Sequence, residues 1–93
     1  MSLQDSLYNW LSIKVVHEAR PDDSAAEETF HSFQHLLEKE HGLSRLKVSK
    51  KDDMYSVTYR KDGEELTSSF PADLIECMLN SILENPERFK NYH

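Results

Sequence analysis

The sequence predicts a small α+β domain of two layers, in which helices cover one face of a three-stranded antiparallel sheet. Apolar residues recur every three to four positions in three segments, which is the helical period, and alternate with polar ones between residues 43 and 70, which is the strand period. The dipeptide Asp62-Gly63 is typical of a two-residue β-hairpin turn. The 93 residues suit one domain, 1–93, with the order α-α-β-β-β-α.

The first predicted helix covers residues 1–20. Ser2 is a suitable N-cap, and Pro21 ends the helix because it disfavours helical geometry at Arg20. One apolar stripe follows the helical spacing and should face the core, and it consists of Leu3, Leu7, Trp10, Leu11 and Val15.

Three further residues of this helix, Tyr8, Ile13 and Val16, lie off the stripe and make the apolar surface wide. Two interpretations remain open. The helix either has neighbours on two sides, or it leaves these residues partly exposed on a monomer, where they would form a protein interface. They are therefore the candidate residues for contact with a partner protein or a second copy.

The second predicted helix covers residues 22–41. Ser24 and Glu27 have the spacing of a capping box, and Gly42 follows the helix where a positive φ is needed. Its apolar face is formed by Ala26, Phe30, Phe33 and Leu37.

Residues 43–70 should form the sheet as two consecutive hairpins. Pairing outward from Asp62-Gly63 sets Lys61 opposite Glu64, Tyr59 opposite Leu66 and Tyr55 opposite Phe70. For the other hairpin, a four-residue turn over residues 50–53 would set Val48 opposite Tyr55 and Leu46 opposite Val57. Both registers place the apolar side chains on one face.

The last predicted helix covers residues 71–85, and a tail follows over 86–93 with Phe89 and Tyr92. Pro71 fits the first helical position because no hydrogen bond is lost there. The predicted buried stripe consists of Leu74, Ile75, Met78, Leu79 and Ile82. Cys77, on the same helix, has apolar and acidic neighbours and is expected to be a partly buried hydrophobic residue and not a nucleophile.

Composition narrows the classes of function. The formal net charge of −6 argues against a general attraction for nucleic acid or anionic membranes. A lone cysteine and the lack of a recognisable signal peptide or membrane-spanning run predict a soluble, cytoplasmic protein that contacts no membrane. No glycine-rich phosphate loop or catalytic spacing is present, so we expect no cofactor and no enzymatic activity.

A basic region interrupts the acidic chain, since residues 43–62 hold six basic and three acidic residues. From Asp23 onward, the element order α-β-β-β-α resembles that of the double-stranded RNA-binding domain, which implies binding of nucleic acid. That family has a lysine-rich start to its last helix, whereas this chain has Asp73 and Glu76 there. The nucleic-acid alternative would use Arg45, Lys47, Lys50, Lys51, Arg60 and Lys61.

His31 and His35 are four residues apart and would share one side of the second helix, where a divalent metal or small ligand could bind. Zinc requires at least three protein ligands in most sites, and no further His or Cys cluster is evident. We therefore predict no metal site and keep this pair as a second alternative. The leading prediction is a non-enzymatic binding or regulatory module that acts through protein contact or homodimerisation.

Overall fold

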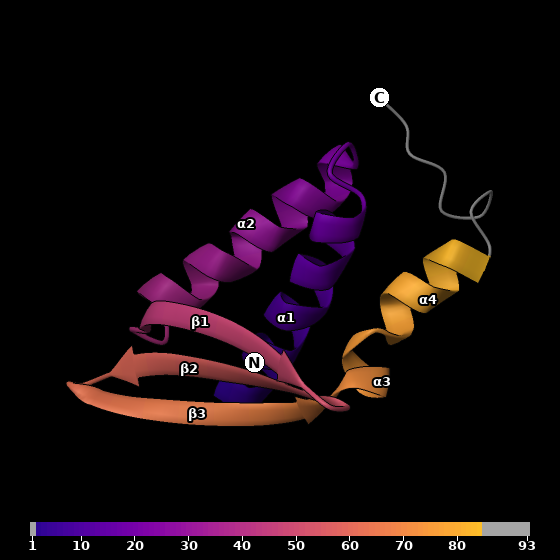
Figure 1. Cartoon of the computed structure of the whole chain (residues 1–93). Coiled ribbons are helices and arrows are strands. Elements are labelled where there is room, and N and C mark those ends of the chain that lie inside the picture. Colours follow the sequence, from indigo (N-terminus) through magenta and orange to yellow (C-terminus); the bar gives the residue numbers. More distant parts are fainter. Residues whose placement is uncertain (1, 85–93) are drawn as a thin grey trace.

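The computed structural model describes residues 2–84 and confirms the α+β fold, with the helices on one side of an antiparallel sheet (Figure 1). The elements are α1 (Leu3–Ala19), α2 (Ser24–Lys39), β1 (Ser44–Lys51), β2 (Met54–Lys61), β3 (Glu64–Pro71), α3 (Ala72–Ile75) and α4 (Cys77–Glu84). The predicted tail over 86–93, with Phe89 and Tyr92, lies outside the described residues.

Side-chain caps define where the two long helices begin. Ser2 caps α1 as predicted, because its Oγ accepts a hydrogen bond from the Asp5 N–H at 3.1 Å. For α2 the predicted cap is wrong by one residue. Asp23 caps this helix by accepting from the Ala26 N–H at 3.1 Å, and Ser24 is already helical.

Helix α1 is buried on more than one side because it contacts α2, α3 and α4 and its apolar residues pack on the sheet. Ile13 and Val16, only 8% and 1% exposed, form a cluster with Ala26 of α2 and Ile82 of α4. For Ile13 and Val16 the interpretation with neighbours on two sides is therefore correct, and the alternative that leaves them partly exposed at an interface is wrong. Tyr8 is half-buried.

The β2–β3 hairpin has the predicted register, with Lys61 paired to Glu64, Tyr59 to Leu66 and Tyr55 to Phe70. Asp62 and Gly63 have φ values of 54° and 80°. Both central residues of a type I′ turn need positive φ, which explains why this dipeptide closes the hairpin.

The β1–β2 register differs from the prediction by two residues. Lys51 pairs with Met54 and Val48 pairs with Val57, so the turn contains only Asp52 and Asp53. Asp52 adopts a φ of 57°, which allows the shorter turn. A shift of two keeps each side chain on its predicted face because side chains alternate with a period of two.

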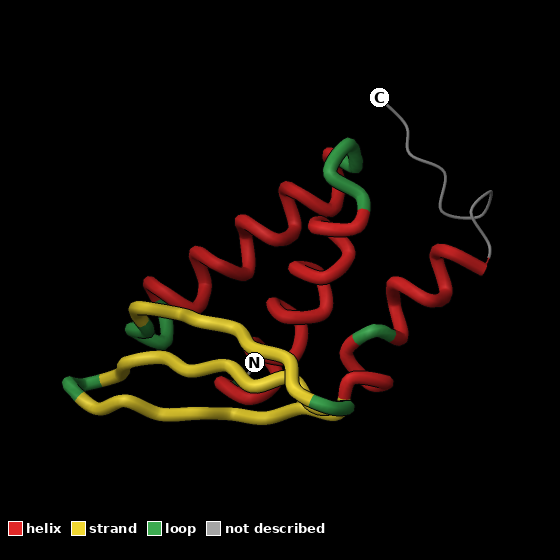
Figure 2. Tube along the Cα trace, in the orientation of Figure 1, coloured by secondary structure: helices red, strands yellow, loops and turns green. Residues whose placement is uncertain are grey.

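The predicted C-terminal helix is two helices that are separated at Glu76 (Figure 2). Pro71 is the last residue of β3 and not the first helical residue. Of the predicted stripe, Ile75 and Ile82 are buried, whereas Leu74 is 51% and Met78 46% exposed. Cys77 is also exposed, contrary to expectation.

Candidate functional site

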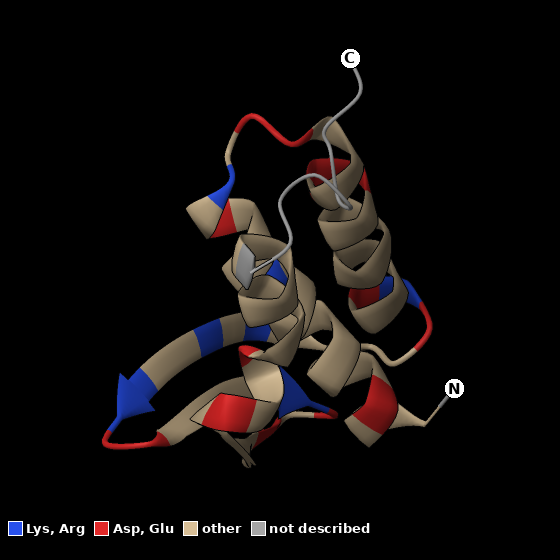
Figure 3. Cartoon of the chain, turned by 90° about the vertical axis from the view of Figure 1, so that its right-hand side faces the viewer, with Lys and Arg blue, Asp and Glu red and all other residues tan. Residues whose placement is uncertain are grey.

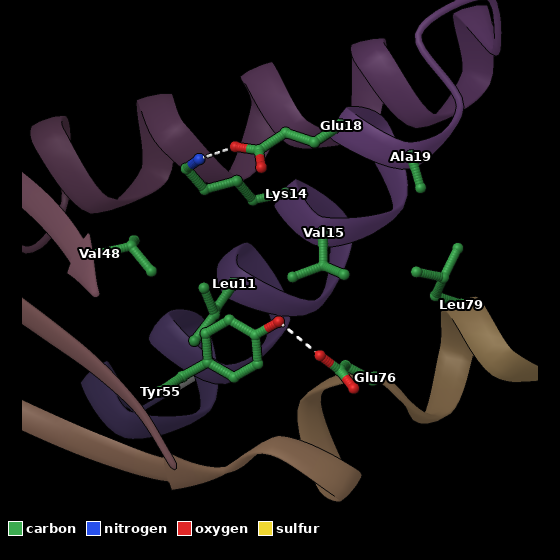
Figure 4. A pocket seen from close by; sticks show the side chains of 9 residues that line it. All are labelled: Leu11, Lys14, Val15, Glu18, Ala19, Val48, Tyr55, Glu76 and Leu79. Atoms are coloured by element: carbon green, nitrogen blue, oxygen red, sulfur yellow. Dashed lines mark hydrogen bonds and ion pairs between the residues drawn. The ribbon is translucent and has the colours of Figure 1, made fainter. Parts of the chain in front are cut away.

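A half-open groove of about 390 Å³ lies between α1, the sheet and the α3–α4 segment (Figure 4). Parts of the chain that are distant in sequence therefore line the same groove. Its lining residues are Leu11, Lys14, Val15, Glu18, Ala19, Val48, Tyr55, Glu76 and Leu79.

Five of the nine lining residues are aliphatic, and we call these five the floor of the groove. Leu11, Val15 and Ala19 are spaced by four residues and therefore share one side of α1. Val48 of β1 and Leu79 of α4 complete the floor from the other elements. Helical spacing places Leu83 one turn beyond Leu79 on the same side of α4. Because Leu83 is 62% exposed, an apolar surface continues past the end of the groove.

A hydrogen-bonded trio holds the break between α3 and α4 against the sheet. The Tyr55 hydroxyl donates to Glu76 Oε2 at 2.6 Å, and Lys50 Nζ donates to the same oxygen at 2.9 Å. Lys50 Nζ also lies 5.3 Å from the centroid of the Tyr55 ring, within the range of a cation–π contact. Glu76 follows the last residue of α3, so the trio fixes the position from which α4 starts.

These surroundings shift the pKa of the Tyr55 phenol and that of the Glu76 carboxyl group. Burial, together with the bond to Glu76, raises the pKa of Tyr55 to about 12. The hydrogen bond from Tyr55, followed by that from Lys50, lowers the pKa of Glu76. At neutral pH the phenol therefore keeps its proton and the carboxyl group is ionised. Lys14 and Glu18 form an ion pair at the α1 side of the groove.

A Tyr55→Phe substitution is expected to lower the free energy of unfolding by about 1 kcal/mol at neutral pH, because one charge-assisted hydrogen bond is lost. Wild type should lose stability as pH falls below about 4.5, where Glu76 is protonated more readily in the unfolded chain. It should also lose stability as pH rises from 10 towards 12, because the folded state retains the Tyr55 proton longer.

Urea unfolding at a series of pH values measures both effects of this substitution. Tyr55→Phe should remove the alkaline loss and reduce the acidic one. The matched control is Tyr59→Phe, since the Tyr59 hydroxyl contacts the neutral Ser68 Oγ at 3.4 Å. If both variants show the same pH profile, Glu76 is not coupled to Tyr55.

The six basic residues of the nucleic-acid alternative do not form one surface. The strand alternation places Lys47, Lys51 and Arg60 on the sheet face away from the helices. Lys50 is paired with Glu76 instead, and Lys61 is opposite Glu64. The sixth, Arg45, is exposed at a register shift at the start of β1. In Figure 3 the ribbon changes from basic to acidic residues at the ends of the strands, so the two kinds of charge alternate along the chain there.

His31 and His35 are both exposed on α2. Within residues 2–84, no group of three or more His, Cys, Asp or Glu side chains could hold a metal ion. His31 Nε2 lies 3.9 Å from Glu27 Oε1. The histidine that the sequence reasoning missed is His17 of α1, whose ring stacks on Phe30 at 5.5 Å between centroids.

Of the three predicted interface residues, Tyr8 is half-buried, and its hydroxyl donates to the backbone carbonyl oxygen of Leu74 at 3.3 Å. Ile13 and Val16 are core residues and do not line the groove. None of the residues that line the groove was predicted as a site residue. Lys50, which bonds to Glu76 of the lining, was predicted only as a candidate for nucleic-acid binding. No spacing in the sequence links Tyr55 to Glu76, which is 21 residues away.

No family model matches this chain, and searches of curated proteins and of solved structures found no significant match. The resemblance to the double-stranded RNA-binding domain thus remains one of element order. None of the described helices is long and apolar enough to cross a membrane.

Proposed function

We propose that this chain is a non-enzymatic binding module that contacts another protein through the groove between α1, the sheet and α4. The observation that carries this proposal is the aliphatic floor of the groove, with charged side chains in the same lining and exposed Leu83 one helical turn beyond Leu79. An apolar centre with a polar rim is the usual anatomy of a protein interface. One or two apolar side chains of a partner would fill the groove.

The polar side chains of the groove are already bonded to one another, which favours a protein partner over a small ligand or a substrate. Small-ligand sites direct a few polar groups at the ligand. Here Glu76 is bonded to Tyr55 and Lys50, and Lys14 is paired with Glu18. The raised pKa of Tyr55 and the lowered pKa of Glu76 move both groups away from the range in which a general acid or base works at neutral pH.

A cytoplasmic location accompanies this proposal. Cys77 is the lone cysteine of the sequence, and it is free and exposed on α4. An exposed thiol is maintained most readily in a reducing compartment.

The test begins with the full chain carrying a photo-crosslinking residue at position 83, expressed in its native cell. Mass spectrometry identifies the cross-linked protein, whose binding to the purified chain is then measured by calorimetry. Leu83→Lys should weaken that binding at least about tenfold, because a charge replaces a contacting apolar side chain. Leu74→Lys is the matched control, since Leu74 is similarly exposed and is not in the groove lining.

Equal affinity of the recovered protein for wild type and Leu83→Lys would contradict the proposed site. Loss of binding in Leu74→Lys alone would place the contact outside the groove, at the exposed side chain of Leu74. Circular dichroism should show that both variants are folded, because both side chains are more than half exposed.

A further inference from the structure

Strand β3 leaves its outer edge open in the part of the chain that the structure describes, since the sheet order is β1-β2-β3 (Figure 1). Lys61 and Glu64 flank a two-residue turn and so form a hydrogen-bonded pair with each other. The alternation then directs the backbone N–H and C=O groups of Glu65, Thr67 and Ser69 away from β2. Pro71 lies in this same outward series, where its missing N–H costs no bond to β2.

The two edges of the sheet differ in how well they resist pairing with another strand. The β1 edge has a register shift between Ser44 and Lys47 and carries several lysines, and both features hinder strand addition. The β3 edge is regular along its whole length, and its residues 66–69 carry no charge. On the helix side of this edge Leu66 is 37% exposed, so an apolar residue remains uncovered there.

We propose that a second copy of this chain pairs antiparallel with β3 and joins the two sheets into one. In the proposed register, the two apolar residues of the strand pair across the interface. Leu66 of each copy is opposite Phe70 of the other. Thr67 is then opposite Ser69, and both residues point their backbone groups outward, as a hydrogen-bonded pair requires. Glu65 is opposite Pro71, so no two acidic side chains face each other across the interface.

A second copy is favoured over an unrelated strand because the β3 sequence is self-complementary in this register and because the pairing covers Leu66. The arrangement has a two-fold axis, so both copies use the same surface and association stops at a dimer. Only the two hindered β1 edges remain at the ends of the joined sheet. This inference does not depend on the groove, which lies between the helices and the β1–β2 part of the sheet.

The experiment is analytical ultracentrifugation of the full chain from micromolar to millimolar concentration, for wild type, Thr67→Pro and Thr67→Ala. Proline at an outward position removes a donor from the dimer interface and none from the bond network with β2. Wild type and Thr67→Ala should show a concentration-dependent dimer. Thr67→Pro should raise the dimer dissociation constant at least about tenfold, since the symmetric interface loses that donor twice.

Circular dichroism checks that Thr67→Pro is folded. If it is not, Leu66→Lys takes its place, because a lysine at the edge disfavours strand pairing and Leu66 is already partly exposed. A wild-type monomer at every concentration would overturn the proposal. So would a dimer of unchanged affinity in the folded edge variant.

Discussion

An Ile13→Asp substitution is expected to destabilise the fold by about 3 kcal/mol or more, from lost apolar burial and from the cost of burying a carboxylate. Ile13 is 8% exposed and packs in a cluster with Val16, Ala26 and Ile82. That cluster joins α1 to both α2 and α4, so its loss should loosen two helix contacts together. Urea unfolding followed by circular dichroism measures the change.

The matched control is Ile13→Val, which removes one methylene and should cost about 0.5–1.5 kcal/mol. If Ile13→Asp kept the wild-type midpoint, the side chain would have to reach water, and the contact between α1 and α4 would be wrong. The substitution is thus a test of the fold, because Ile13, a candidate interface residue from the sequence, is part of the core.

Replacing Trp10 with Ala is expected to cost about 3–5 kcal/mol, the range for removal of a large buried aromatic side chain. Trp10 is buried in α1, and its ring stacks on Phe30 of α2 at 6.2 Å between centroids. Its Nε1–H donates to Gln34 Oε1 at 2.7 Å, which adds a polar contact between the two helices. Denaturant unfolding gives the change in the free energy of unfolding.

Trp10→Phe separates packing from hydrogen bonding at this position. It keeps an aromatic ring but removes the donor to Gln34, so it should cost clearly less than Trp10→Ala. A cost for Trp10→Ala no greater than that of Trp10→Phe would show that the ring contributes little to the α1–α2 contact.

The sheet could be predicted where local chemistry fixes its geometry. Asp62-Gly63 determines the β2–β3 register because both residues must adopt positive φ in the tight turn. The other turn has no glycine, and residues 50–53 were all assigned to it. Asp52 nevertheless adopts a positive φ, so β1 extends to Lys51.

Contacts between helices were predicted less well. Hydrophobic periodicity shows which residues share one face of a helix, but not which other element packs against that face. Ile13 and Val16 have the same spacing whether they meet a partner or the chain's own α2 and α4. The break at Glu76 also left no sequence signal, since neither glycine nor proline is present at that point. The groove depends on contacts between residues far apart in the chain, of which Tyr55 with Glu76 is the clearest.

The most direct test of the central claim is methyl nuclear magnetic resonance of the full chain, titrated with the protein recovered by cross-linking. If an apolar side chain enters the groove, the methyl signals of Val15, Val48 and Leu79 should shift together and saturate at one equivalent. The methyl signals of Leu66 and Leu74, which are exposed elsewhere, should not follow that titration. Shifts at Leu66 or Leu74 without any change at the three groove residues would contradict the account.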